Sequence, residues 1–346
     1  METNKNELKR AELWSGDKKN RVRCALCHHR CLIHEGRRGV CGVRENQGGV
    51  LYSLNYGKLI STNTDPIEKK PLFHFYPGTT SLSIATVGCN LRCLNCQNAT
   101  ISQWPVDNPE KSLPGEYVPP EVIVELAVAR KCTTIAYTYT EPTIFLEYAR
   151  HVAQRASQAG IKNVFVTNGY MTQDALDFMG DDLHAANVDL KSADESVMKK
   201  LTGAHAQPVL DNFREMHSRG IWVEATTLVI PGYNDDDTSL RDIAKFLAQT
   251  SIDIPWHVSR FHAAYKLPHL KSTPTSALKR AHEIGKEAGL RYIYTGNLWG
   301  DDNESTICPS CGKIVISRYG FTIRDTHLRD GRCAHCRAQI AGVGLP

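Results

Sequence analysis

Between residues 81 and 295, hydrophobic and polar positions alternate between two periods. Short apolar runs rich in β-branched and aromatic residues predict seven strands, at residues 81–87, 133–139, 163–167, 186–190, 221–229, 256–261 and 291–295. Segments with a period near 3.6 lie between them and predict helices at residues 122–131, 142–160, 209–220, 239–250 and 276–289. In the second of these helices Ile144, Tyr148 and Val152 share one face, and Gly160 stands at the C-cap.

This alternation of strands and helices predicts the fold class. Strands that alternate with helices pair in parallel through right-handed crossovers. Seven strands predict an α/β fold with a partial (β/α)6-like TIM barrel, and a doubly wound sheet is the alternative. We expect an N-terminal cysteine-rich region over residues 1–80, the barrel over residues 81–300 and a small cysteine module over residues 301–346.

Composition narrows the class of protein. The 346 residues are 41% hydrophobic and 23% charged, which is the ordinary balance of a globular protein. A net charge of +4 falls short of a nucleic-acid signature and argues against a nucleic-acid partner. No apolar run approaches the roughly 20 residues that cross a bilayer, and the first residues lack a signal-peptide pattern. We therefore expect a cytoplasmic protein without membrane contact.

The chain has twelve cysteines, and eleven of them fall into three groups. In a chain without a secretory signal, clustered cysteines indicate metal ligands rather than disulfides. The first group has the spacing C-x2-C-x3-C-x9-C, the second C-x3-C-x2-C, and the third consists of two C-x2-C pairs: Cys24, Cys27, Cys31 and Cys41; Cys89, Cys93 and Cys96; Cys308, Cys311, Cys333 and Cys336. The remaining Cys132 is predicted to be a small buried hydrophobic residue.

The middle group follows the first predicted barrel strand directly. This is the C-terminal end of the barrel, where enzymes of this architecture build their sites. An iron–sulfur cube normally takes four thiolates, and a structural zinc site takes four ligands. Three cysteines in one loop leave both kinds of centre open, because a fourth ligand could come from elsewhere in the fold.

The segment GCNLRCLNCQN, residues 88–98, resembles the signature of the radical S-adenosylmethionine (SAM) enzymes. The resemblance implies a barrel of the radical SAM type, in which Cys89, Cys93 and Cys96 bind three irons of a [4Fe–4S] cluster and SAM chelates the fourth. It further implies reductive cleavage of SAM to a 5′-deoxyadenosyl radical, which takes hydrogen from a small molecule or a partner protein. The electron would come from an external flavodoxin- or ferredoxin-like reductant.

The resemblance also implies that SAM contacts residues at the ends of successive strands. These residues are Glu141, Thr167, Asn168, Asp189, Lys191 and His262. Glu141 would accept from the methionine ammonium, and Asp189 with Lys191 would suit the charged ends of a zwitterion. Each also has a structural interpretation: Thr-Asn-Gly as a turn, Asp189 as a helix N-cap, Glu141 as a solvated carboxylate and His262 as a surface histidine.

Two further segments narrow the resemblance. DPIEKKPLFHFYPG (65–78) and IAYTYTEPTIFLEY (135–148), together with the cysteine loop, are similar to the AmmeMemoRadiSam-type proteins, relatives of pyruvate formate-lyase-activating enzymes. The likeness implies Memo-like and AMMECR-like partner proteins, and its activating-enzyme relatives suggest glycyl-radical activation. The acidic residue that precedes Thr-Asn-Gly in those relatives is Val166 here. Lys69 and Lys70 beside Glu68 predict a solvated charged turn, with the lining of an entrance for substrate or partner as the alternative.

The outer cysteine groups are interpreted by spacing. Four soft ligands near the N-terminus could hold zinc or a second iron–sulfur cluster. The two C-terminal pairs, with 21 residues between them, predict a zinc-ribbon or rubredoxin-like module with zinc, and a single tetrathiolate iron is the alternative. A different class of function also stays open, namely a non-enzymatic adaptor with zinc at all three groups that docks a protein or nucleic acid.

Overall fold

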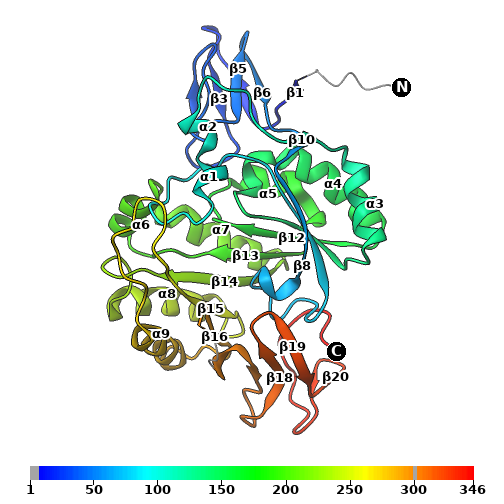
Figure 1. Ribbon diagram of the computed structural model, residues 1–346, viewed down its shortest axis with the longest axis vertical. Helices are drawn as coiled ribbons and strands as arrows, with labels where there is room; N and C mark the ends of the chain where they lie inside the picture. Colours follow the sequence, from blue (N-terminus) through cyan, green and yellow to red (C-terminus); the bar gives the residue numbers. More distant parts are fainter. Residues whose placement is uncertain (1–7, 299–301) are drawn as a thin grey trace.

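The computed structural model describes residues 8–298 and 302–346 (Figure 1). Small N-terminal strands lie at one end of the long axis, the main sheet and its helices fill the middle, and the C-terminal strands lie at the other end. The predicted border between barrel and C-terminal module, at residue 300, lies outside the described residues, as do residues 1–7 of the predicted N-terminal region.

All seven predicted strands are present in one sheet. They are β9 (Thr80–Ala85), β11 (Thr134–Tyr137), β12 (Lys162–Thr167), β13 (Ala185–Asp189), β14 (Trp222–Val229), β15 (Trp256–Arg260) and β16 (Ile293–Gly296). Each pairs in parallel with the next along the chain, without a reversal of order. A doubly wound sheet would reverse its order at a switch point. The sheet therefore confirms the partial barrel and excludes the alternative.

An eighth strand, β8 (Ser61–Pro66), was not predicted. It runs antiparallel to β9, with Ser61 opposite Ala85 and Pro66 opposite Thr80. Its sequence, STNTDP, shows no apolar alternation, because an edge strand can be held by backbone pairing alone. In the described part of the chain β8 and β16 form the two ends of the sheet, so the barrel stays open.

Helices cover the outer face of the sheet (Figure 1). The predicted ones are α3 (Pro120–Ala129), η2 (Pro142–Phe145) with α4 (Leu146–Gln158), α7 (Ala206–Ser218), α8 (Asp237–Thr250) and α9 (Thr275–Glu287). Two short helices, α5 (Gln173–Met179) and α6 (Glu195–Thr202), were not predicted, although Thr172 and Asp194 cap them by accepting from backbone N–H groups. Two further single turns, α1 (Ala99–Ser102) and α2 (Trp104–Asp107), follow the cysteine loop.

The N-terminal region consists of short antiparallel strands. From residue 8 onward these strands form two small sheets of their own, β1 (Lys9–Arg10), β6 (Val50–Ser53) and β5 (Arg44–Gln47), and β2 (Trp14–Gly16), β3 (Val22–Cys24) and β4 (Leu32–Ile33), while β7 (Lys58–Leu59) pairs with β10 (Glu116–Tyr117) from farther along the chain. A buried ion pair joins this region to α4, because Arg44 Nη2 lies 2.5 Å from both carboxylate oxygens of Glu147. Both side chains are 1% exposed. Loss of one partner from such a pair costs about 3–5 kcal/mol.

Residues 67–76, which begin with η1 (Ile67–Lys69), form the floor of the barrel, because Ile67, Leu72 and Phe75 share a buried cluster with residues of β11, β12 and β13. Glu224, on β14, accepts from the backbone N–H groups of Phe73 at 3.0 Å and His74 at 2.8 Å. The solvated turn expected here is wrong for Lys70 and Glu68, which are 2% and 1% exposed. The reason is that buried partners replace water: Asp65 lies 2.7 Å from the Lys70 ammonium, and the backbone N–H of Gly78 donates to Glu68.

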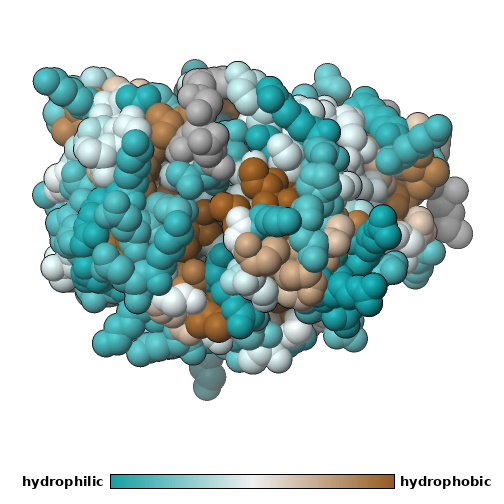
Figure 2. All heavy atoms as spheres, turned by 90° about the horizontal axis from the view of Figure 1, so that it is seen from below, coloured by the Kyte–Doolittle hydropathy of each residue, from teal (hydrophilic) through white to brown (hydrophobic). Residues whose placement is uncertain are grey.

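The C-terminal strands form a ribbon below the barrel (Figure 1). After η4 (Asp302–Glu304) they are β17 (Thr306–Ile307), β18 (Ile314–Tyr319), β19 (Thr322–Thr326), β20 (Leu328–Arg329) and β21 (Arg332–Cys333). Val315, Ile316 and Ile340 of the ribbon pack in one cluster with Phe73 and Tyr294. Apolar side chains gather on the face seen from below (Figure 2), and the exposed apolar residues of this module include Ile307, Ile314, Tyr319, Phe321 and Val343.

None of the helices in residues 8–298 and 302–346 is both long and apolar enough to cross a membrane.

Candidate active site

The loop that carries Cys89, Cys93 and Cys96 begins directly after β9. Three backbone hydrogen bonds hold it: Arg92 N donates to Thr202 O at 2.8 Å, Leu94 N to Leu201 O at 2.9 Å and Lys266 N to Leu94 O at 3.0 Å. The loop is thus held between the end of α6 and the segment that follows β15. Fixed backbone on both sides therefore determines where the three thiols lie.

The entry to this loop needs a glycine. Gly88 has a φ of +100°, and a Cβ atom there would lie 2.7 Å from Val43 Cγ1 and 3.0 Å from the carbonyl oxygen of Cys41. The guanidinium of Arg92 then donates to the carbonyl oxygens of Cys89 and Leu91, both at 2.9 Å. The turn therefore combines a backbone conformation that favours glycine with a cation that satisfies its carbonyl groups.

The thiols themselves lie in a poorly solvated place. Cys89 is buried, and Cys93 and Cys96 are half-buried. Burial raises the pKa of the Cys89 thiol well above its ordinary value. Burial also raises the pKa of Cys93 to about 11, although the Lys191 ammonium opposes the shift. Thiolates at such positions need a nearby positive centre, which a metal cluster supplies.

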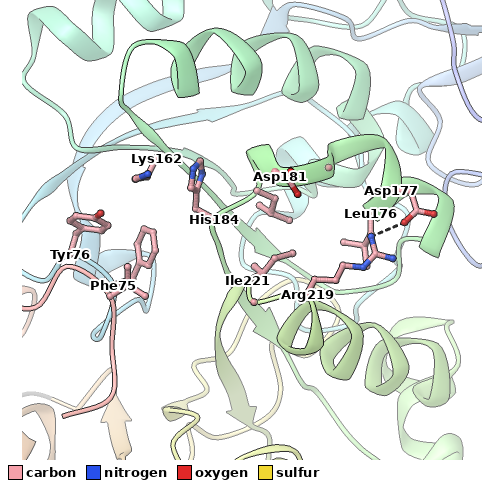
Figure 3. Close-up of a pocket in the computed structure, with 13 residues that line it drawn as sticks. Phe75, Tyr76, Lys162, Leu176, Asp177, Asp181, His184, Arg219 and Ile221 are labelled. Atoms are coloured by element: carbon pink, nitrogen blue, oxygen red, sulfur yellow. Dashed lines mark ion pairs between the residues drawn. The ribbon is translucent and has the colours of Figure 1, made fainter. Parts of the chain in front are cut away.

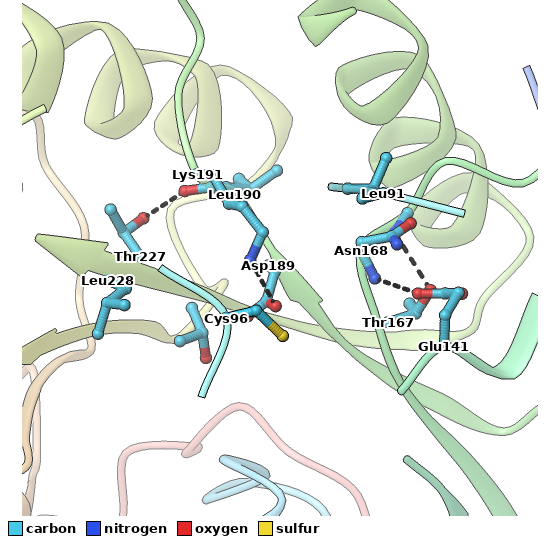
Figure 4. Close-up of polar contacts among 12 residues, drawn as sticks. Leu91, Cys96, Glu141, Thr167, Asn168, Asp189, Leu190, Lys191, Thr227 and Leu228 are labelled. Atoms are coloured by element: carbon cyan, nitrogen blue, oxygen red, sulfur yellow. Dashed lines mark hydrogen bonds and ion pairs between the residues drawn. The ribbon is translucent and has the colours of Figure 1, made fainter. Parts of the chain in front are cut away.

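Glu141, Thr167 and Asn168 form one hydrogen-bonded group across the ends of β11 and β12 (Figure 4). The Glu141 carboxylate accepts from Thr167 Oγ1 at 2.7 Å, from Asn168 N at 2.8 Å and from Thr143 N at 3.1 Å. It is fully buried, and burial raises its pKa. The solvated interpretation of Glu141 is therefore wrong, because the carboxylate organises the turn that follows β12.

Asn168 connects this group to the cysteine loop. Its amide nitrogen donates to Asn90 Oδ1 at 2.7 Å and lies 3.8 Å from Cys89 Sγ. Its side-chain oxygen accepts from the backbone N–H of Tyr170 at 3.0 Å, so the amide orientation is fixed. The Thr-Asn-Gly segment is a turn, as the structural interpretation holds, and it also reaches a cysteine of the loop.

Asp189 is the last residue of β13, Lys191 lies two residues after it, and the two side chains form an ion pair of 2.8 Å (Figure 4). Burial alone would lower the pKa of Lys191, but the Asp189 carboxylate and the thiols of Cys93 and Cys96 outweigh it and raise that pKa. Asp189 is no helix cap, since Asp194 caps α6. A cation with its counter-ion thus lies beside the thiols.

His262 lies apart from these groups. It is exposed on the segment after β15, and its Nδ1 lies 3.2 Å from Ser272 Oγ. Within the described residues no hydrogen bond or ion pair joins His262 to the cysteine loop, although Lys266 of the same segment contacts Leu94. The structure brings together every other residue predicted to contact SAM.

Sequence reasoning missed two residues beside the site. His29 Nε2 lies 2.7 Å from the carbonyl oxygen of Asn90, and the Arg92 guanidinium donates to the carbonyl oxygen of Val40. Arg92 directly precedes Cys93, and His29 lies between Cys27 and Cys31, which is the signal that could have found them. They bind the N-terminal cysteine segment to the cysteine loop.

The four C-terminal cysteines form a compact group. Their sulfur atoms all lie within 4.8 Å of one another, with Cys308 and Cys336 at 3.6 Å and Cys311 and Cys333 at 3.8 Å. Four thiolates around one tetrahedral ion at about 2.3 Å are separated by roughly 3.8 Å. The group is therefore the size of a single-ion site.

A cavity lies at the opposite end of the barrel (Figure 3). It has a volume of about 710 Å³ and is lined by residues at the N-terminal ends of β12 and β13, among them Lys162 and His184. An ion pair of 2.7 Å between Arg219 and Asp177 lies on its wall. Parallel barrels build their sites at the C-terminal ends of the strands, so this cavity is separate from the cysteine site.

Comparisons with known proteins identify the family. The sequence profile of the Radical SAM superfamily matches residues 83–246, which include the cysteine loop and the ends of β11 to β14. The uncharacterized protein MJ0808 of Methanocaldococcus jannaschii is 44% identical over 324 residues, which cover 93% of this chain and 95% of that protein. The chain belongs to the radical SAM superfamily.

The chain is also similar to more distant proteins. The pyruvate formate-lyase 1-activating enzyme of Escherichia coli K12 is 20% identical over 60% of this chain and 89% of its own. The isethionate sulfite-lyase activating enzyme of Oleidesulfovibrio alaskensis is 26% identical over 37% of this chain and 43% of its own. The crystal structure of Streptococcus suis SuiB bound to the precursor peptide SuiA shares the fold, with a TM-score of 0.51 and 13% identity over 68% of this chain and 52% of that one.

Membership of the radical SAM superfamily decides the class of function. The chain is an enzyme, and the cofactors of its superfamily are a [4Fe–4S] cluster and SAM. This excludes the alternative of a non-enzymatic zinc adaptor.

Proposed function

We propose that Cys89, Cys93 and Cys96 each bind one iron of a [4Fe–4S] cluster, and that SAM binds the fourth iron. The observation that carries the proposal is the meeting of the three-thiol loop with the Asp189–Lys191 pair and the Glu141–Asn168 group, all at the C-terminal ends of neighbouring strands. When bound, the cluster and SAM supply a 5′-deoxyadenosyl radical. The protein's part is to hold and orient both.

The polar groups around the loop have separate tasks in this proposal. Asn168 fixes the turn beside Cys89, since its amide donates to Asn90 in the loop. Lys191 and Asp189 bind the carboxylate and ammonium of the methionine portion, because a cation and an anion lie together next to the thiols. Glu141 is a positioning residue, because both of its oxygens already accept from Thr167 and Asn168. His262 would contact the nucleoside from its loop.

We propose a partner protein as the substrate, with a glycine Cα–H as the bond that loses hydrogen. Two relatives carry the names of activating enzymes, for pyruvate formate-lyase and isethionate sulfite-lyase, and they support this choice over a small molecule. An external flavodoxin- or ferredoxin-like reductant supplies the electron, and Memo-like and AMMECR-like proteins are the proposed companions. Zinc is the proposed ion of the C-terminal ribbon, whose sulfur spacing suits it.

The first test measures SAM cleavage. The anaerobically reconstituted enzyme, given SAM and a reductant, is expected to release 5′-deoxyadenosine and methionine. Cys93→Ala should abolish this release, because one iron loses its thiolate. Cys132→Ala is the matched control, since Cys132 is a buried cysteine outside the three groups. Release that persists in Cys93→Ala, or a fully loaded enzyme that releases none, would contradict the proposal.

The second test addresses the substrate. Candidate partner proteins labelled with deuterium at glycine Cα are incubated with the reduced enzyme and SAM. Deuterium in the 5′-deoxyadenosine shows that the radical took hydrogen from that position. Deuterium transfer from a labelled small molecule and none from any protein would overturn the choice of a protein substrate.

A further inference from the structure

The four N-terminal cysteines form a second thiol site that packs against the cysteine loop of the barrel. Strands β3 and β4 form a hairpin that brings Cys24 and Cys31 together, and Cys24 N donates to Cys31 O at 3.0 Å. Cys27 pairs through its backbone with Met171, in the segment after β12. Cys24, Cys27 and Cys41 are buried in the main hydrophobic core, and Cys31 is half-buried at its edge.

The spread of the sulfur atoms distinguishes the cysteine groups of this chain. In residues 8–298 and 302–346, the C-terminal ribbon is the one place where three or more ligand atoms of Cys, His, Asp or Glu all lie within 4.8 Å of one another. The N-terminal thiols share one core but are more widely spread than that. The thiols of Cys89, Cys93 and Cys96 are more widely spread in the same way.

This difference has a chemical meaning. A single tetrahedral ion draws its thiolates to about 3.8 Å from one another. In an iron–sulfur cube each thiolate binds a different iron, so the thiolates stand farther apart. The ribbon has the spacing of the first kind of centre, and the N-terminal group resembles the cysteine loop instead.

A buried cation lies beside the N-terminal thiols. The Arg44 side chain is buried, and its Nε has no hydrogen-bond partner within the described part of the chain. Its two terminal nitrogens already have partners, since Nη2 pairs with Glu147 and Nη1 donates to Glu12 O. Buried donors are almost always satisfied, so the free N–H indicates that an acceptor belongs at this place. Thiolate and sulfide sulfur atoms of a metal centre are such acceptors, and their negative charge suits a guanidinium.

From these observations we infer that Cys24, Cys27, Cys31 and Cys41 bind a second iron–sulfur cluster of the cubane type, rather than one zinc ion.

Contacts between the two loops suggest what the second cluster does. His29 lies 2.7 Å from the carbonyl oxygen of Asn90, Arg92 donates to Val40 O, and a Cβ on Gly88 would meet the carbonyl oxygen of Cys41. The two thiol sites thus share one packed wall, at the top of the barrel in Figure 1. Cys31, at the edge of the core, gives the second site a side that approaches solvent.

The inferred role is electron transfer, and this part rests on the proposed function. An external flavodoxin- or ferredoxin-like reductant gives one electron to the N-terminal cluster and is itself oxidised. The N-terminal cluster then passes that electron to the cluster at Cys89, Cys93 and Cys96 and returns to its oxidised state.

Metal and sulfide analysis tests the identity of the centre. The wild-type protein reconstituted with iron and sulfide should hold about eight irons and eight sulfides per chain, as two cubes require. A variant with Cys89→Ala, Cys93→Ala and Cys96→Ala should keep about four of each, and Cys24→Ala with Cys27→Ala should also keep about four. A single iron bound in the ribbon would raise the iron count but add no sulfide. The sulfide count therefore distinguishes a second cube from iron in the ribbon. Cys132→Ala should match the wild type.

The triple variant also gives the result that would contradict the inference. If the triple variant holds no sulfide and binds a second zinc ion besides that of the ribbon, the N-terminal cluster is disproved. Should either variant fail to fold, Mössbauer spectra of the wild type decide instead. Two cubes should appear, of which SAM perturbs one, and a single cube would overturn the inference.

The electron route has its own measurement. The rate of 5′-deoxyadenosine release is compared between a reduced flavodoxin and dithionite, a small reductant that can reach either centre. The rate with flavodoxin divided by the rate with dithionite should fall several-fold in the variant that combines Cys24→Ala and Cys27→Ala. An unchanged ratio would refute the relay while the metal count still identifies the cluster. Wild-type enzyme that releases nothing with either reductant would refute the proposed function instead.

Discussion

At the scale of single residues, Gly88 shows how closely the two thiol sites are packed. Its φ of +100° and the two atoms that a Cβ would meet, Val43 Cγ1 and Cys41 O, both oppose a side chain. Gly160 has a φ of +76° and no atom within 4 Å of a Cβ. The two glycines therefore separate the cost of backbone conformation from the cost of crowding.

We predict that Gly160→Ala lowers the free energy of unfolding by about 1 kcal/mol, the cost of the left-handed backbone. Gly88→Ala should lower it by about 3 kcal/mol or more, because the neighbours must also move. Urea denaturation of both variants measures the difference. If both variants lose the same free energy of unfolding, the residues around Gly88 rearrange at little cost to make room for a Cβ atom.

Residues with rare chemistry were the easiest to predict. The spacing of Cys89, Cys93 and Cys96 is visible in eleven residues of sequence, and their place after a strand follows from the pattern. The burial of Lys70 was not predictable, because its partner Asp65 lies on β8, an edge strand without an apolar signal. A charged residue is solvated or buried according to what the rest of the fold brings next to it.

At the scale of elements, the segment 67–76 joins the barrel to the C-terminal ribbon. His74 is fully buried, and its Nδ1 lies 2.6 Å from Ala341 O while its Nε2 lies 2.5 Å from the Tyr294 hydroxyl. A neutral imidazole satisfies both contacts, donating to the carbonyl and accepting from the phenol. Burial lowers the pKa of His74 to about 4.

The pH dependence of stability follows from that shift. Between pH 6.5 and pH 4 the unfolded chain binds a proton at His74 that the folded protein does not bind, so stability falls as the pH falls. We predict that about 2 kcal/mol of the loss in unfolding free energy between pH 7 and pH 5 comes from this group and disappears in His74→Gln. Denaturation at the two pH values measures it.

The matched control is His217→Gln, since His217 is exposed on α7. This variant should keep the pH dependence of the wild type. If His74→Gln also loses as much unfolding free energy between pH 7 and pH 5 as the wild type, the His74 imidazole is not held neutral in the folded protein.

Elements with a strong period were predicted well, and weak ones were not. The strands of the barrel lie where buried runs of β-branched and aromatic residues predict them. Helices α5 and α6 were missed, because seven or eight residues hold too few turns for a clear 3.6-residue pattern. Short elements form where neighbours and caps support them, and Thr172 and Asp194 are those caps.

At the scale of the whole molecule, cysteine modules stand at both ends of the barrel (Figure 1). The N-terminal one packs on the end that carries the radical SAM loop, and the ribbon packs on the opposite end. Metal removal at the ribbon should therefore affect stability without affecting the irons at the other end.

We predict that Cys308→Ser with Cys333→Ser loses about one metal ion per chain, keeps its iron–sulfur content and unfolds at a lower temperature. The ribbon's Val315 and Ile316 cover Phe73, so a loosened ribbon exposes the floor of the barrel. Elemental analysis and thermal unfolding measure both effects. Ile307→Ser, at an exposed ribbon position, is the control and should change neither. Loss of iron and sulfide in the cysteine variant would show that the two ends are coupled.

Local pattern alone predicts the class of fold and the existence of three cysteine sites, because period and spacing are properties of neighbouring residues. The folded chain decides the rest. The spread of the sulfur atoms, the contact of His29 with Asn90 and the burial of Lys70 each join residues far apart in the sequence. The distances between such residues depend on how the barrel curves and on which segments pack against its two ends. No short stretch of sequence contains that information by itself.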